Sequence, residues 1–275
     1  MNKKKILFIL GSGRCGTYSF VQALKKFSYV EAHHEFFFEP TLKLATLYHM
    51  KMISKNKVKN FILNNHYFSI KNSNKKIWVD SSNALPWIAD VLIEIFPNAK
   101  FLHLIRNGKK VVSSFYNKFN NEMYKDENVK KLKNFLIHKK KKKLSSEKKY
   151  WRPIPIYNKK EFNKFISSGQ FYRICKYWTE INYKIENSLM STNNSYTFKF
   201  EDIVIKKKTK KLFNFLDLYK INFDTFYNSF KKPVNIGIKK NYMLTKKQNI
   251  IFNEVCNDEM IKYGYDETEY EVKYC

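Results

Sequence analysis

The sequence predicts an α/β fold of three layers, in which helices flank a central, mainly parallel sheet of the P-loop-like type. Short apolar runs alternate along the chain with segments of helical periodicity, and the first run ends in a glycine-rich loop. Such alternation is typical of parallel sheets that are covered on both faces. The 275 residues can bury a sizeable core. We therefore expect a single domain over residues 1–275.

The elements follow in a regular order. A continuous apolar run predicts a strand at Ile6–Leu10, and short segments rich in apolar residues predict further strands at Tyr29–Ala32, Ile77–Val79, Lys100–Ile105 and Tyr196–Phe200. Apolar residues at helical spacing predict helices at Phe20–Phe27, Leu42–Met52, Val58–Phe68, Pro86–Phe96, Gly108–Phe119, Phe162–Leu189 and Thr245–Tyr263. The resulting pattern is that of one α/β domain without internal repeats.

The chain is strongly basic, with 52 Lys and Arg against 24 Asp and Glu and a formal net charge of +28. Lysines dominate residues 130–149, and prolines follow in Trp151–Pro155, so we expect a basic insertion at about residues 125–160. Such a run is more often a solvated surface than a binding site. A protein that binds nucleic acid or another polyanion, with Tyr150, Trp151 and Tyr157 as stacking groups, is the alternative from a different class.

The four cysteines, Cys15, Cys175, Cys256 and Cys275, are scattered without the spacing of a zinc site. This usage predicts a reducing, cytoplasmic location. No apolar run approaches the roughly 20 residues that a membrane span needs, so we expect none. The sequence does not indicate an oligomeric state.

A candidate phosphate loop, Gly11–Thr17, joins the first predicted strand to the first predicted helix. Glycines let the backbone approach a ligand closely, and the N–H groups at a helix start favour an oxyanion. Arg14 adds a permanent positive charge and Thr17 a hydroxyl donor. The Lys-Ser/Thr ending of the Walker A motif is missing, which weakens the alternative of a nucleotide kinase. An ordinary glycine-rich turn is the structural alternative.

A second segment, Phe101–Ser114, places Arg106 at the end of a strand and Ser114 two turns into the next helix. Ligands of open α/β sheets bind beyond the carboxyl ends of the strands. Both side chains can therefore point at one crevice, which we expect the first loop to share. A surface ion pair for Arg106 and a neutral helix position for Ser114 are the alternatives.

Together, the two segments and their order resemble the PAPS-dependent sulfotransferases, which use 3′-phosphoadenosine 5′-phosphosulfate (PAPS) and release adenosine 3′,5′-bisphosphate. Weaker similarities are found at Trp78–Ser82, Tyr177-Trp178, Phe200–Asp202 and Tyr263–Tyr265. Cys15 stands where the family usually has Ser, and Asn107-Gly108 replaces a commoner Asp-Pro pair. The resemblance implies transfer of a sulfuryl group from PAPS to a hydroxyl or amine, without a metal.

The resemblance also implies roles for residues of this chain. Arg14, Gly16 and Thr17 would contact the 5′-phosphosulfate, and Gly13, Cys15 and Tyr18 of the same loop are further candidates for cofactor binding. Arg106 and Ser114 would bind the 3′-phosphate. Lys239 and Lys240, beside Gly237, are candidates for the adenine-contacting region near the end of the chain.

The acceptor side needs a base, and family members often carry a catalytic Glu after the second strand. Glu35 is the first candidate because burial among phenylalanines would make its carboxylate more basic, and His34 is the second. Arg14 would stabilise the departing charge. Adjacent His33 and His34 project to opposite sides of a strand, so we expect no metal site there.

Further polar residues are candidates for acceptor contacts: Glu39, Asp80 and Ser81. Solvated surface charge for the glutamates, and helix capping around Ser82 and Asn83, are the alternatives. The acceptor itself, a glycan or a small metabolite among the options, is not identified by the sequence.

Overall fold

Five parallel strands form the centre of the fold in this computed structural model, which describes residues 4–117, 122–138, 144–154, 158–218, 220–231 and 243–265. The strands are β1 (Lys5–Leu10), β2 (Val30–His34), β3 (Ile77–Ser82), β4 (Lys100–Ile105) and β5 (Ser195–Lys199). Their spatial order is β2-β3-β1-β4-β5, and all four pairings are parallel. The predicted fold class is therefore confirmed.

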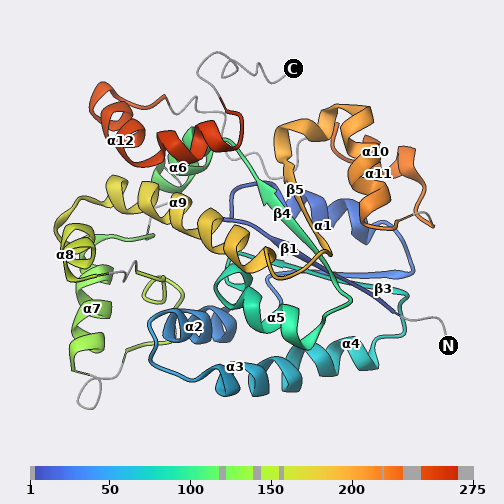
Figure 1. The fold of residues 1–275 in the computed structure, drawn as a ribbon, viewed down its shortest axis with the longest axis horizontal. Helices are drawn as coiled ribbons and strands as arrows, with labels where there is room; N and C mark the ends of the chain where they lie inside the picture. The colour runs from blue at the N-terminus through green and yellow to red at the C-terminus, as the bar shows by residue number, and fades with distance from the viewer. Residues whose placement is uncertain are drawn as a thin grey trace.

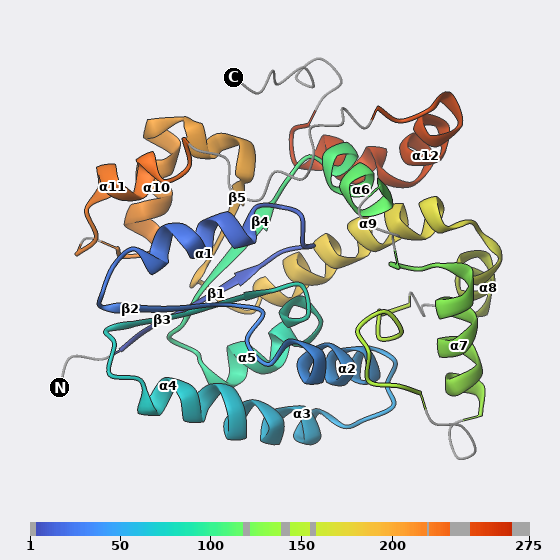
Figure 2. The same ribbon diagram turned by 180° about the vertical axis from the view of Figure 1, so that it is seen from behind.

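Helices cover both faces of this sheet. They are α1 (Thr17–Lys25), α2 (Phe38–His49), α3 (Lys55–Ile62), α4 (Phe68–Asn72), α5 (Ala89–Ile95), α6 (Gly108–Asn117), α7 (Asp126–Ile137), α8 (Lys159–Ser167), α9 (Gln170–Leu189), α10 (Lys206–Phe215), α11 (Phe223–Asn228) and α12 (Lys246–Lys262). Short 3₁₀ segments cover Leu85–Ile88 and Phe200–Val204. Figures 1 and 2 show α1, α10 and α11 on one side of the sheet and α2 to α5 with α9 on the other.

Alternating side chains of the strands enter two separate cores. In β1, Leu7 and Ile9 pack with α1, α10 and α11, whereas Phe8 and Leu10 pack with the larger set of helices on the opposite face. This two-residue period is what a strand with both faces covered requires. The continuous apolar run of β1 is thus explained by burial on both sides.

The carboxyl ends of the strands meet at one edge of the sheet. β1 lies between β3 and β4: the chain passes from β1 to β2 and β3 on one side, and then crosses over β1 to β4 on the other side. In doubly wound sheets such a reversal opens a crevice beyond the strand ends. The segments that follow β1, β2, β3 and β4 therefore converge where the sequence predicts the site.

One predicted helix is divided in the structure. The expected helix over 162–189 is α8 followed by α9, because Ser168 and Gly169 adopt extended backbone conformations between them. The buried Arg173 of α9 donates from Nε to the Phe165 carbonyl at 3.0 Å and from Nη2 to the Ile166 carbonyl at 2.8 Å. These bonds satisfy carbonyls that the end of a helix leaves without partners. A tertiary contact therefore stabilises the break.

A second predicted helix is longer and less regular than expected. The periodicity of 58–68 covers α3 and then a π-helical turn, Leu63–Tyr67, which α4 continues to Asn72. The extra residue in a π-turn shifts the side chains that follow it. His66 is thereby fully buried beneath the sheet edge.

The described parts of the basic region, 122–138 and 144–154, pack onto the larger core. α7 buries Val129 and Leu132, and the later segment buries Tyr150 and Trp151, which are 8 % and 1 % exposed. The two aromatic residues are therefore not available as surface stacking groups for nucleic acid, which corrects that part of the alternative interpretation. Tyr157 lies outside the described residues. Within the described part of the chain, no helix is long and apolar enough to cross a bilayer.

Candidate functional site

The phosphate loop is built on backbone conformations that favour glycine. Gly13 and Gly16 have φ values of 78° and 96°, and Arg14 between them has a φ of 57°. A β-carbon on Gly16 would lie 2.2 Å from the ring of Phe200, so the loop and the end of β5 are in close contact. Gly16 provides no side-chain cap to α1, and the first turn of α1 contains no acidic residue. The helix start therefore presents N–H groups suited to an anion.

Two guanidinium groups meet beside this loop. Arg106 follows β4 and donates from Nη1 to the carbonyl oxygen of Arg14 at 3.0 Å. The Nε of Arg14 donates to the hydroxyl of Ser114 on α6 at 2.9 Å. Burial and the neighbouring charge of Arg106 lower the pKa of Arg14. Arg14, Arg106 and Ser114 thus form one positively charged group, as an oxyanion site requires.

The segment around Arg106 is held by contacts from distant parts of the chain. The side-chain oxygen of Asn107 accepts a hydrogen bond from the N–H of Lys110 at 3.3 Å and so caps α6. Asn can therefore replace the commoner Asp here, because both residues are good helix caps. The backbone N–H of Asn107 donates to Glu201 at 3.1 Å, and the hydroxyl of Tyr265 donates to the other Glu201 oxygen at 2.9 Å. The ring of Phe200 lies 5.7 Å from the guanidinium of Arg106. These residues position the cationic group.

Cys15 faces the core rather than the crevice. Its side chain is fully buried, and burial raises the pKa of its thiol. A neutral, buried thiol is a poor nucleophile. Any contact of Cys15 with a phosphate would come from its backbone N–H. Thr17 is also buried, whereas Tyr18 is partly exposed and its ring lies 5.3 Å from that of His34.

The turn after β2 also has an unusual backbone. Glu35 and Phe37 have φ values of 64° and 48°, although neither is glycine. The N–H of Glu35 donates to the carbonyl of Ser81 at 2.8 Å, and the N–H of Phe36 donates to Asp80 Oδ1 at 3.2 Å. Strained conformations of this kind persist only where the surroundings enforce them, and they are common at functional sites. The end of β3 therefore determines where Glu35 lies.

His33 and His34 point to opposite faces of the sheet. His33 packs against Trp78 and Phe36, whereas His34 contacts Tyr18 and pairs through Nδ1 with the hydroxyl of Ser81 at 2.9 Å. Burial lowers the pKa of His34, although the carboxylates of Glu35 and Asp80 oppose the shift. His34 is therefore neutral at neutral pH.

Beneath this turn, Asp80 and His66 form a fully buried polar pair. His66 Nε2 lies 3.4 Å from Asp80 Oδ2, and both side chains are 0 % exposed. Asp80 and Ser81, proposed from the sequence as acceptor contacts, thus lie behind Glu35 and His34 and hold them. Glu39 is exposed in the first turn of α2.

Tyr177 of α9 links the phosphate loop to the acceptor side. Its hydroxyl donates to the carbonyl of Ser12 at 2.8 Å. Burial raises the pKa of this hydroxyl, the charge of Arg152 lowers it, and Cys15 and Glu35 raise it further.

The structure brings together most of the residues proposed from the sequence. The phosphate loop, Arg106, Ser114, His34 and Glu35 lie at one edge of the sheet, while Lys239 and Lys240 lie outside the described residues. Sequence analysis did not assign roles to Phe200, Glu201 or Tyr177, although their segments were noted for similarity. It named Asn83 only as a possible helix cap and assigned no role to Arg152, which carries no local signal. Among the described residues, no three His, Cys, Asp or Glu side chains gather as metal ligands.

Comparison with known proteins identifies the family of this chain. The model of the sulfotransferase family matches residues 7–158, more than half of the chain, and no curated protein matches. Among solved structures, a sulfotransferase from Alicyclobacillus acidocaldarius has 13% identity and a TM-score of 0.46, over 96% of this chain and 97% of that chain. Mouse sulfotransferase SULT7A1 complexed with PAP has 13% identity and a TM-score of 0.43, over 94% of this chain and 85% of that one. On the strength of the family match, this chain belongs to the sulfotransferase family.

Proposed function

We propose that this protein transfers a sulfuryl group from PAPS to a hydroxyl or amine of an acceptor, and that the PAPS site lies at the phosphate loop. The observation that carries the proposal is the pair of guanidinium groups, Arg14 and Arg106, joined to Ser114 beside the uncapped start of α1. Guanidinium groups are the side chains that bind phosphate and sulfate most specifically, because their N–H donors match the oxyanion geometry. A nucleotide with phosphates at both ends of its ribose fits such a site.

Each group of the loop has a distinct role in this proposal. The N–H groups at Gly16 and Thr17 bind the 5′-phosphosulfate, and Arg106 and Ser114 bind the 3′-phosphate. Arg14 lies between them, because its carbonyl accepts from Arg106 and its Nε donates to Ser114. Its permanent charge stabilises the oxygen that becomes negative as the sulfur–oxygen bond of PAPS breaks.

Glu35 is the proposed base. As the new bond forms between the acceptor oxygen and sulfur, the acceptor proton passes to the Glu35 carboxylate, and adenosine 3′,5′-bisphosphate leaves. The backbone strain at Glu35 and its enforcement by Ser81 support this assignment, because they fix the backbone of Glu35 at the same edge of the sheet as the phosphate loop. His34, which is neutral and bonded to Ser81, is the second candidate.

The first experiment is calorimetric titration with adenosine 3′,5′-bisphosphate in EDTA, in parallel with ATP and Mg²⁺. We expect tight binding without metal, and a loss of at least about 100-fold in Arg106→Ala, because hydrogen bonds to a charged group are worth about 1.5–3 kcal/mol each. Lys148→Ala, which removes an exposed charge, is the matched control. Binding of Mg-ATP alone would contradict the proposal and favour a nucleotide kinase.

The two candidate bases are separated by Glu35→Gln and His34→Asn, assayed with PAPS and a panel of hydroxyl acceptors. We expect Glu35→Gln to lower kcat by about 100-fold or more, because general bases contribute about 10²–10⁴-fold. Nucleotide affinity should be unchanged in both variants. A larger loss of kcat in His34→Asn would identify His34 as the base instead.

A further inference from the structure

Buried polar atoms without hydrogen-bond partners lie in the region of Tyr177. Asn83 Oδ1 and Trp87 Nε1 are buried, and among the described residues neither has a hydrogen-bond partner. The rings of Trp87 and Tyr177 lie 6.2 Å apart, and the amide of Asn83 packs against Gly13 of the phosphate loop. Buried polar groups without partners are rare in proteins, and they indicate an absent water or ligand. This region therefore presents unused hydrogen-bonding groups beside the proposed reaction centre.

Arg152 contributes the charged member of this group. Its Nε and Nη1 atoms are buried and have no hydrogen-bond partner within the described part of the chain. Within the ranges that the structure describes, no ion pair joins it to a carboxylate. Arginine stays protonated in proteins, so it cannot escape the cost of burial by losing its charge. An oxyanion is the natural partner of such a group.

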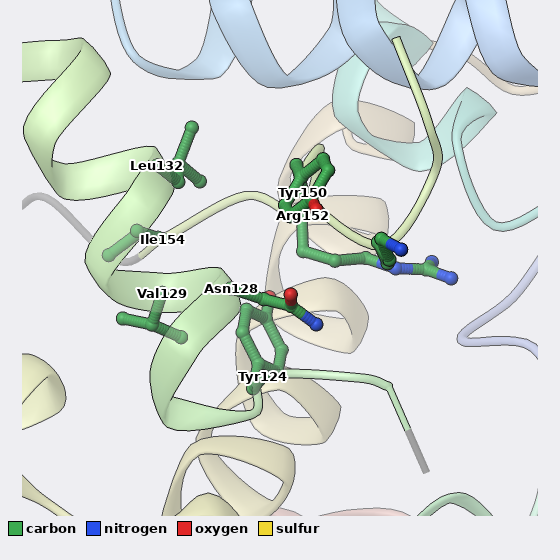
Figure 3. A pocket seen from close by; sticks show the side chains of 8 residues that line it. Tyr124, Asn128, Val129, Leu132, Tyr150, Arg152 and Ile154 are labelled. Atoms are coloured by element: carbon green, nitrogen blue, oxygen red, sulfur yellow. The ribbon is translucent and has the colours of Figure 1, made fainter. Parts of the chain in front are cut away.

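The position of Arg152 is set by its neighbours in the chain. The hydroxyl of Tyr124 donates to the Pro153 carbonyl, and His49 Nε2 lies 3.2 Å from the carbonyl oxygen of Ile154. The ring of Tyr124 lies 5.9 Å from that of Tyr177, which places this segment beside the phosphate loop. Figure 3 shows the guanidinium pointing away from the apolar residues of the small pocket, Val129, Leu132 and Ile154. It therefore extends beyond the pocket.

Asn83 lies two residues after Ser81, whose carbonyl accepts from the N–H of Glu35, and it packs against Gly13. The unpartnered polar atoms therefore lie beside the turn that carries Glu35. Glu35 is the proposed base for an acceptor hydroxyl. Arg152 is then suited to a second, anionic group of the same molecule.

We propose that Arg152, with Asn83 and Trp87, forms an acceptor subsite that binds an oxyanion, a carboxylate or a sulfate, on an acceptor whose hydroxyl faces Glu35. This inference rests on the proposed function and specifies its substrate class. Asn83 Oδ1 accepts from a neighbouring acceptor hydroxyl, and Trp87 Nε1 donates to an acceptor oxygen. Neutral alcohols should then be poor acceptors.

The test uses three probes that share one ring and differ only at carbon 6: p-nitrophenyl β-D-glucoside, its glucuronide and its glucoside 6-sulfate. Each is titrated calorimetrically into the full chain saturated with adenosine 3′,5′-bisphosphate, and again without nucleotide. We expect one or both anionic probes to bind about 10- to 100-fold more tightly than the glucoside. The anionic probe with the larger gain in affinity over the glucoside shows whether the site prefers a carboxylate or a sulfate.

Variants of Arg152 test whether this residue causes the higher affinity for the anionic probes. Arg152→Gln should abolish the preference for the anionic probes, Arg152→Lys should retain part of it, and Lys148→Gln, an exposed control nearby, should retain all of it. Equal affinity for the three probes, or no binding of any, would overturn the inference. Loss of nucleotide binding in Arg152→Gln would also overturn the inference, because Arg152 would then belong to the PAPS site. Failure of the wild-type protein to bind the nucleotide, with anion preference intact, would count against the proposed function alone.

Discussion

The phosphate loop after β1 and the turn after β2 both hold residues of positive φ at the same edge of the sheet, but by different means. The loop uses glycine at two of its three positive-φ positions, whereas the turn uses Glu35 and Phe37. Glycine adopts such conformations without a steric cost. The turn instead depends on bonds to Asp80 and Ser81. The loop is therefore specified locally, and the turn by the strand beside it.

The largest expected effect comes from adding one methyl group to the loop. Gly16→Ala combines a φ of 96° with a β-carbon 2.2 Å from the Phe200 ring. We expect it to lower the free energy of unfolding by about 4 kcal/mol, from backbone strain together with overpacking, and to abolish nucleotide binding. Urea unfolding and calorimetry measure the two effects.

Gly169→Ala is the matched control for this variant. Its φ is −73°, and no atom lies within 4 Å of the added carbon. It should be neutral or stabilising by up to about 1 kcal/mol. If both variants lose the same stability, local glycine conformation does not specify the loop.

The corresponding test of the turn is Asp80→Ala. It removes the acceptor of the Phe36 N–H and leaves His66 buried without its neighbour. We expect a loss of about 3 kcal/mol in urea unfolding, because breaking one partner of a buried polar pair is costly. Asp217→Ala, which breaks an exposed pair with Lys5, should cost less than about 1 kcal/mol. Equal losses would show that the turn does not depend on β3.

A smaller expected effect is the pH dependence of stability, because each of the two regions has a buried histidine nearby. Burial lowers the pKa of His103, on β4 behind Arg106, to about 4, with its Nε2 bonded to Asn182 Oδ1 at 3.0 Å. Burial also lowers the pKa of His49, in the helix after the turn, to about 4. Both residues bind a proton on unfolding below their ordinary pKa of about 6.5, so stability is full above that pH and falls as the pH drops toward 4.

Because both pKa values fall to about 4, we expect each histidine to account for a loss of about 2 kcal/mol between pH 7 and pH 5. Urea unfolding of His103→Gln and His49→Gln across this pH range measures each contribution. The unfolding free energy of each variant should depend less steeply on pH than that of the wild-type protein. A slope unchanged in His103→Gln would show that the donor side of the sheet is not the acid-sensitive region.

Much of the fold was predictable from the sequence because its determinants are local. The apolar runs of β1 and β4, the glycines of the phosphate loop and the positions of Arg106 and Ser114 all indicated their roles without knowledge of neighbours. The division of α8 from α9 was not predictable from periodicity. It depends on the side chain of Arg173, which reaches back to the carbonyls of the preceding helix.

The acceptor side shows where prediction from sequence ended. Glu35 was a candidate by its place after a strand, but its backbone strain and its support by Asp80 and Ser81 come from pairing between distant segments. Arg152 was one more basic residue in a basic region. Only its burial without a partner, beside Tyr177, makes it a candidate binding group.

The sequence by itself determined the alternation of strands and helices, the anion-binding loop and the two arginines, because backbone freedom, periodicity and charge are properties of residues and their spacing. Only the tertiary structure decided which polar groups are satisfied. Burial and partnership depend on residues that lie far apart in the chain, as Asp80 does from Phe36 and as Arg152 does from Tyr177. The physical reason is that the cost of a buried polar group is set by its neighbours in space rather than by its neighbours in sequence.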